Sequence, residues 1–204
     1  MIVIDGEFSG LDHTKHGLLS LGAVDLNNPE KQFYGECRLE EWMTFTEEAL
    51  GVNGFSEQDI YDTSKKTIKE MIHEFDDWLK TCSTPQILIG QNPKSDMDFL
   101  RTSYEIAGLE YPLGHRSLDT HTIVFMKHLQ LGHDILIEKG NYKINLDESL
   151  RFVGIRGGEP RPHNALTGAK CEAEVVSRVI YGKKLLPEFE DIDIPVYLSR
   201  DENL

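Results

Sequence analysis

Two carboxylates near the start of the chain could hold a metal ion. Asp5 and Glu7 end an apolar run that reads as a strand, and residues two apart on a strand point to the same face. Neighbouring carboxylates repel each other unless a positive charge lies between them. Mg²⁺ and Mn²⁺ prefer such oxygen ligands, so the pair predicts a site for a hard divalent cation. A solvated strand end is the alternative for an isolated pair of this kind.

A third acid stands where a predicted strand leads into a predicted helix. Asp96 follows the apolar run over residues 86–90 and begins a helix predicted over residues 96–107, with Ser95 as its cap. In open α/β sheets, ligand sites form at such crossings. Asp98 lies about 200° further round the helix, so the two acids cannot face one site. The alternative for Asp96 alone is an ordinary acid in the first turn of a helix.

One histidine has a setting that suits proton transfer. His163 lies between Pro162 and the longest predicted helix, and the other seven histidines have no comparable position. An imidazole with a pKa near 6.5 can take a proton from water at neutral pH. A surface-loop histidine is the alternative.

The elements that must position these residues follow an α/β pattern. Three strand-like runs come first, and helices then alternate with two further strands. This order predicts an α/β fold with a mixed five-stranded sheet flanked by helices. We expect one domain over residues 1–182 and an acidic tail over residues 183–204 that packs partly on it. The strands are predicted over 2–7, 17–26, 32–39, 86–90 and 116–119, and the helices over 65–82, 96–107, 122–129, 146–153 and a last stretch that ends near Gly182.

Composition limits how the protein could meet a nucleic acid. The 204 residues include 21 Lys and Arg against 35 Asp and Glu, a net charge of −14. This balance excludes binding by broad neutralisation of phosphates, which needs a basic face. It leaves open a protein that meets one phosphate through a divalent metal, because the metal supplies the positive charge. No apolar run is long enough for a membrane span, and no basic leader precedes an apolar stretch. Three widely spaced cysteines without a C-x-x-C pattern predict reduced thiols in a cytoplasmic protein.

Several motifs in order resemble a known family. Residues 4–11 read IDGEFSGL, similar to D-x-E-x-T/S-G-L, and residues 91–100 read QNPKSDMDFL, similar to H-N-x-x-F-D-x-x-F-L. Residues 18–24 and 49–56 look like two further stretches, with Asn53 where histidine is commoner. Together they resemble the DnaQ-like DEDD 3′–5′ exonucleases of the ribonuclease H-like fold, in the histidine-bearing subgroup. The resemblance covers residues 1 to about 182 and selects Asp96 rather than Asp98.

The third motif departs from the family pattern. The family has an aspartate five residues after the histidine, whereas this chain has Gly168 five residues after His163. Glu172 lies one turn further along the same helix face, about 6 Å away. Two readings of Glu172 are open: a metal ligand that replaces the missing acid, or a solvated helix acid, and the second is favoured.

The resemblance implies hydrolysis of phosphodiester bonds with two Mg²⁺ or Mn²⁺ ions. Asp5 would bridge both ions, Glu7 would hold the ion that carries the attacking water, and Asp96 would hold the ion at the leaving 3′-oxygen. His163 would accept the proton of the water.

The substrate implied by the resemblance is DNA or RNA with a free 3′ end, single-stranded or short. Phe8, Ser9, Gly10 and Leu11 would contact the terminal nucleotide, and Asn92 completes the expected substrate-binding residues. The sequence does not decide between DNA and RNA. A homodimer is open, because relatives in this fold often dimerise.

The missing acid has a measurable consequence. Gly168 predicts slow or Mn²⁺-favouring hydrolysis, and Gly168→Asp is expected to raise turnover sharply. The main alternative is a catalytically silent module of the same fold that binds 3′ ends or protein partners. Hydrolysis of a small phosphodiester is a third reading.

Overall fold

The computed structural model describes residues 1–135 and 137–199 and has a mixed five-stranded sheet at its centre. The strand order is β3-β2-β1-β4-β5. The first three strands, β1 (Ile2–Phe8), β2 (Leu18–Asp25) and β3 (Gln32–Glu36), pair antiparallel. The other two, β4 (Leu88–Gly90) and β5 (Ser117–Asp119), run parallel to β1. The predicted α/β fold with a mixed five-stranded sheet flanked by helices is confirmed.

Both faces of β1 are covered, and alternate residues enter different cores. Ile2 and Ile4 pack in the larger core with the helices α3 (Ile68–Lys80) and α4 (Lys94–Ala107). Val3 packs on the other face against Ala169 and Ala173 of α7. Because side chains alternate along a strand, Asp5 and Glu7 share the face of Val3 and point towards α7.

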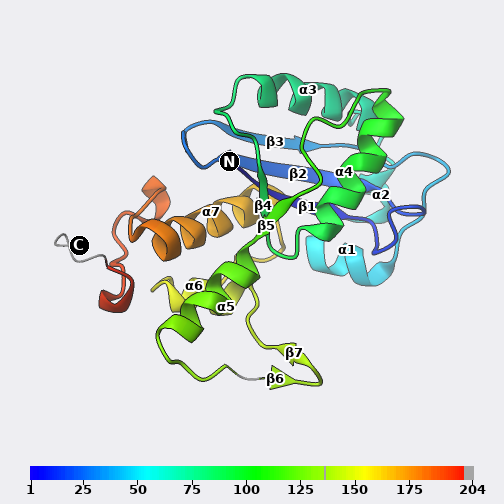
Figure 1. Ribbon diagram of the computed structural model, residues 1–204. Coiled ribbons are helices and arrows are strands. Elements are labelled where there is room, and N and C mark those ends of the chain that lie inside the picture. Colours follow the sequence, from blue (N-terminus) through cyan, green and yellow to red (C-terminus); the bar gives the residue numbers. More distant parts are fainter. Residues whose placement is uncertain (136, 200–204) are drawn as a thin grey trace.

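The helix α7 (Ala165–Tyr181) crosses the sheet at close range, opposite α3 and α4 (Figure 1). Gly22 on β2 permits this approach, because a Cβ atom there would overlap the backbone of Ala165. The helices α5 (Thr120–Gln130) and α6 (Leu146–Phe152) pack on α7 around a second core. As predicted, α7 ends at Gly182, which adopts the left-handed conformation with φ of 63°.

Some short elements differ from the sequence prediction. The chain also forms α1 (Glu47–Asn53), α2 (Glu57–Ile60) and a small hairpin of β6 (Ile137–Glu138) and β7 (Asn141–Tyr142), none of which was predicted. Ser95 does not cap α4: Pro93 occupies the cap position, and its φ of −65° already matches a helix, so Ser95 falls inside the first turn. Two short 3₁₀ turns follow α7, at Pro187–Phe189 and Val196–Leu198.

The segment after α7 folds back through a buried arginine. Arg178 is fully buried and forms an ion pair with Glu174, with 2.6 Å between Nε and Oε1. Its guanidinium also donates to the carbonyl oxygens of Val153, Phe189 and Ile192. Residues 200–204, which belong to the acidic tail expected from the sequence, lie outside the described residues.

Two further features bear on the sequence expectations. The three cysteines are free and buried. Within residues 1–135 and 137–199, no helix combines the length and apolar character that a membrane crossing requires.

Candidate active site

Two acids, Asp5 and Glu7, lie on the same face at the end of β1. Asp5 and Glu7 lie on the α7 side of the sheet, and a bulge between Glu7 and Phe8 ends the regular pairing with β2. Glu7 is only 8% exposed. Its pKa is raised to about 7 by burial and by the nearby carboxylate of Glu159.

Burial separates the two acids of α4. Asp96 is buried in the first turn, and burial together with Glu7 raises its pKa to about 8. Asp98 is half-buried and forms an ion pair with Lys94 on the same helix. The helical geometry therefore directs Asp96 alone towards the acids of β1.

Glu172 is not a solvated helix acid, and that favoured reading is wrong. Its side chain is only 2% exposed. Its Oε2 accepts a hydrogen bond from Thr120 Oγ1 at 3.3 Å. Burial and the neighbouring Asp96 raise its pKa well above the usual range.

A further acid, Glu159, was missed by the sequence analysis. It lies in the loop before α7, and its side chain is 6% exposed. Its Oε2 lies 3.2 Å from Nδ1 of His163. Burial and Asp147 raise its pKa to about 7. The four-residue separation from His163 is the one sequence signal that could have indicated it.

These side chains form an acidic cluster, which we define as Asp5, Glu7, Asp96, Glu159 and Glu172. The pKa of Asp5 is raised well above its usual range by burial, and each of the other four carboxylates adds to the shift. All the donors are carboxylate oxygens, the type that Mg²⁺ and Mn²⁺ prefer. Among the described residues, no three His, Cys, Asp or Glu side chains are already arranged as ligands. The cluster fits a divalent cation by the chemistry of its donors.

His163 lies beside this cluster in a form suited to accept a proton. Its side chain is 25% exposed, and its Nε2 is buried with no hydrogen-bond partner among the described residues. Burial and the charge of Arg161 lower its pKa, so the imidazole is neutral at pH 7. Its backbone amide donates to the carbonyl oxygen of Val52, which ties the loop to α1.

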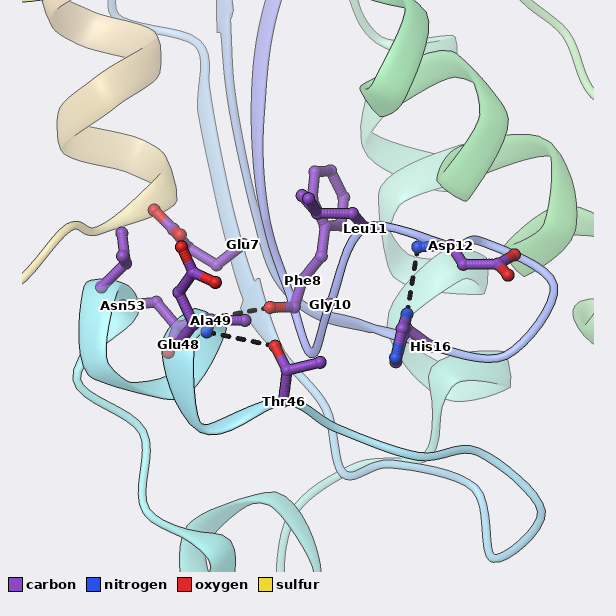
Figure 2. Close-up of a pocket in the computed structure, with 11 residues that line it drawn as sticks. Glu7, Phe8, Gly10, Leu11, Asp12, His16, Thr46, Glu48, Ala49 and Asn53 are labelled. Atoms are coloured by element: carbon purple, nitrogen blue, oxygen red, sulfur yellow. Dashed lines mark hydrogen bonds between the residues drawn. The ribbon is translucent and has the colours of Figure 1, made fainter.

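Two cavities meet the end of β1. The first, of about 440 Å³, has Glu7 at its edge and is lined mainly by residues after β1 and by α1 (Figure 2). The second, of about 220 Å³, contains four groups already described, Asp5, Glu159, His163 and Glu172, together with Arg161. The larger, mainly apolar cavity therefore reaches Glu7, and the smaller, acidic cavity reaches Asp5.

The expected substrate residues are only partly brought together. Phe8, Gly10 and Leu11 line the larger cavity, and Leu11 is 95% exposed. Ser9 does not line it: its hydroxyl donates to the carbonyl oxygen of Thr44 and accepts from the amide of Gly17, so it holds the loop. Asn92 is exposed and lines neither cavity.

Two residues outside the expected set shape the same cavity. Asn53, at the end of α1, is buried, and its Nδ2 donates to the carbonyl oxygen of Phe8 at 3.1 Å. Phe8 stacks on Phe99 of α4, with 4.0 Å between ring centroids. These contacts connect the wall of the cavity to both neighbouring helices.

The raised pKa values lead to a prediction about stability. An acid with a raised folded-state pKa binds more protons in the folded than in the unfolded state, so stability falls as pH rises through that window. For Glu7 and Glu159 the window runs from about 4.5 to about 7. In EDTA, we expect a lower Tm at pH 8 than at pH 5.5. Saturating Mn²⁺ should raise the Tm more at pH 8 than at pH 5.5. Thermal melts followed by circular dichroism test this, and a Tm in EDTA that rises over this pH range would contradict it.

A mixed sheet of the order β3-β2-β1-β4-β5, flanked by helices on both faces, is the arrangement of the ribonuclease H-like fold. Residues 1–180 match the 3′-5′ exoribonuclease Rv2179c-like domain. The chain therefore belongs to that family.

Solved structures share the fold at low sequence identity. Cell-death related nuclease 4 is 15% identical, with a TM-score of 0.68 over 90% of this chain and 64% of that one. The nuclease domain of 3′hExo, a DEDDh family member bound to rAMP, is 15% identical, with a TM-score of 0.65 over 91% of this chain and 93% of that one. Exonuclease I of E. coli with a dT13 oligonucleotide is 13% identical, with a TM-score of 0.66 over 86% of this chain and 40% of that one. This chain therefore spans under two thirds of the first and third. No curated protein sequence matches it significantly.

Proposed function

We propose that the chain removes nucleotides from the 3′ end of single-stranded or short RNA by hydrolysis with two divalent ions. The observation that carries this proposal is the convergence of buried acids on β1, α4 and α7 beside a histidine nitrogen that has no partner among the described residues. The family description favours RNA over DNA as the substrate. The neighbours solved with rAMP and dT13 support nucleic acid as the ligand.

Asp5, Glu7 and Asp96 are the proposed metal ligands. Bound Mg²⁺ or Mn²⁺ would lower the pKa of water and neutralise charge on the phosphate. Asp5 lies centrally in the acidic cluster, since its pKa responds to all four other carboxylates. This position suits a carboxylate shared by two ions. With ions present, the cluster would also become attractive to the phosphate of the substrate, in spite of the net charge of −14.

His163 is the proposed general base. Its neutral imidazole would accept the proton of the attacking water at Nε2, the nitrogen without a partner among the described residues. The carboxylate of Glu159, beside Nδ1, would then stabilise the imidazolium.

The larger cavity is the proposed site of the terminal nucleoside. Its volume of about 440 Å³ lies within the range of small-molecule pockets. Phe8 and Leu11 offer apolar surface to the base, and Gly10 lets the chain turn closely past His16. Ser9 would act by holding this turn, and Asn92 would contact the substrate from an exposed position. No base-specific pattern of donors is required for such contacts.

The proposal is tested with 5′-labelled RNA and DNA oligonucleotides of the same sequence. With Mg²⁺ or Mn²⁺, we expect a ladder of products shortened from the 3′ end, faster on RNA, and no products in EDTA. Weak long-range attraction should make the enzyme release the strand after few cuts at physiological salt. Binding of the oligonucleotides without shortening in either metal would instead support the silent module, which Gly168 favours.

The proposal also covers the domain bounds, the cellular location and the oligomeric state. We propose residues 1–182 as the exonuclease domain, with residues 183–204 as an appended tail. A cytoplasmic location agrees with the three free cysteines. A homodimer stays a prediction, and sedimentation analysis of the full chain would test it.

A further inference from the structure

One carboxylate oxygen in the acidic cluster has no partner. Glu159 Oε1 is buried and makes no hydrogen bond within the described part of the chain. The other oxygen of the same carboxylate faces His163. A buried, unpaired carboxylate oxygen is unfavourable, so its position calls for a ligand.

The free oxygen lies close to the backbone of Gly168. A Cβ atom at Gly168 would lie 3.2 Å from Glu159 Oε1 and would overlap Oδ2 of Asp5. The Glu159 carboxylate thus lies beside the place from which a side chain at position 168 would start. It also faces Glu7, whose pKa it helps to raise.

The loop that carries Glu159 is held in place. The amide of Glu159 donates to Asp147 Oδ1 at 2.8 Å, and Asp147 lies in the first turn of α6. Gly158 has a φ of 72°, and a Cβ atom there would crowd the same Asp147 carboxylate. The loop geometry therefore fixes where the Glu159 side chain enters the cluster.

We propose that Glu159 is a ligand of the divalent cation in the acidic cluster and that the lack of a side chain at Gly168 leaves room for the carboxylates of Asp5 and Glu159 together. This assignment rests on the proposed function, because it assumes that the cluster binds a metal. A loop residue then supplies the carboxylate that α7 lacks at position 168.

Glu172 is the competing candidate, and its contacts differ. Its carboxylate already accepts from Thr120 Oγ1 and is stabilised by the backbone amide of Gln91. Within residues 1–135 and 137–199, Glu159 Oε1 has no such partner. We therefore assign Glu159 rather than Glu172 to the place beside Gly168.

The first test measures Mn²⁺ binding to the full chain, with free Mn²⁺ followed by electron paramagnetic resonance. Glu159→Gln should weaken Mn²⁺ binding on the order of 10–100-fold. The matched control is Glu105→Gln, an exposed glutamate on α4, which should bind as the unaltered chain does. Unchanged Mn²⁺ affinity in a folded Glu159→Gln variant would overturn the assignment.

Moving the carboxylate from position 159 to position 168 gives an independent test. In the Glu159→Gln background, Gly168→Asp should restore Mn²⁺ affinity, because it returns a carboxylate to the same space. In the unaltered chain, Gly168→Asp should bring no gain, because Glu159 already supplies that carboxylate. The shift of Asp5 that the new Cβ atom requires is common to both backgrounds. The absence of a gain differs from the rise in turnover expected from the sequence alone, and a sharp rise with Glu159 intact would count against the assignment.

Asp5→Asn and Glu159→Gln distinguish a failure of the proposed function from a failure of the Glu159 assignment. If Asp5→Asn leaves Mn²⁺ binding unchanged, the cluster is not a metal site and the proposed function fails. If Asp5→Asn abolishes binding and Glu159→Gln does not weaken it, only the assignment of Glu159 fails.

Discussion

Asp5→Asn is expected to lower the rate of 3′-end hydrolysis on the order of 10³-fold, because it removes the carboxylate central to the metal site. A loss of about 4 kcal/mol of transition-state stabilisation corresponds to such a factor. Measurement of product release from a labelled oligonucleotide under single-turnover conditions gives this value directly.

The same substitution should stabilise the metal-free protein. The raised pKa of Asp5 means that its ionised form is unfavourable when folded, because it is buried among four carboxylates. Asparagine removes that penalty, which grows as pH rises above the usual range of an aspartate. We therefore expect a higher Tm in EDTA for Asp5→Asn, together with a smaller rise in Tm on addition of Mn²⁺.

Asp98→Asn is the matched control for this prediction. Asp98 is an aspartate near the site but is paired with Lys94 and turned away from the cluster. Its replacement should leave both hydrolysis and the response to Mn²⁺ unchanged. Equal hydrolysis by Asp5→Asn and Asp98→Asn would show that the acidic cluster is not the catalytic centre.

Arg178→Met is expected to lower the free energy of unfolding by about 3–5 kcal/mol, because it leaves a buried carboxylate without its partner. Glu174 would lose its ion pair at a fully buried position. The carbonyl oxygens of Val153, Phe189 and Ile192 would also lose their donor. Chemical denaturation of the full chain measures the change.

The control for this substitution is Arg151→Met, on the exposed side of α6. It should change the free energy of unfolding by less than about 0.5 kcal/mol, as is usual for surface positions. A similar small change for Arg178→Met would show that the segment after α7 is held by other contacts.

The periodicity of the sequence is sufficient to predict which faces of the strand and the helix carry the acids Asp5, Glu7 and Asp96. The two-residue spacing of Asp5 and Glu7 predicts a shared face, and they share the face that packs on α7. The helical angle between Asp96 and Asp98 predicts that only one enters the site, and burial shows that it is Asp96. The end of α7 at Gly182 follows from the left-handed conformation that glycine adopts without strain.

Other residues could not be placed by local patterns. Ser9 belongs to a motif that suggests substrate contact, but its hydroxyl bonds to Thr44, 35 residues away. Glu172 has the spacing of a solvated helix acid, and it is buried only in the folded structure, where it contacts Thr120 of α5, 52 residues away. Glu159 lies in a loop without periodicity, so its side-chain direction depends on the contact with Asp147.

The sequence by itself therefore determined the elements and the faces on which the first acids lie, because strand and helix periods are local properties of the backbone. Tertiary structure decided which acids meet. Asp5 and Glu159 come together beside Gly168, where a Cβ atom would overlap the Asp5 carboxylate and crowd that of Glu159. This close approach arises from packing of segments distant in the sequence, which no local spacing encodes.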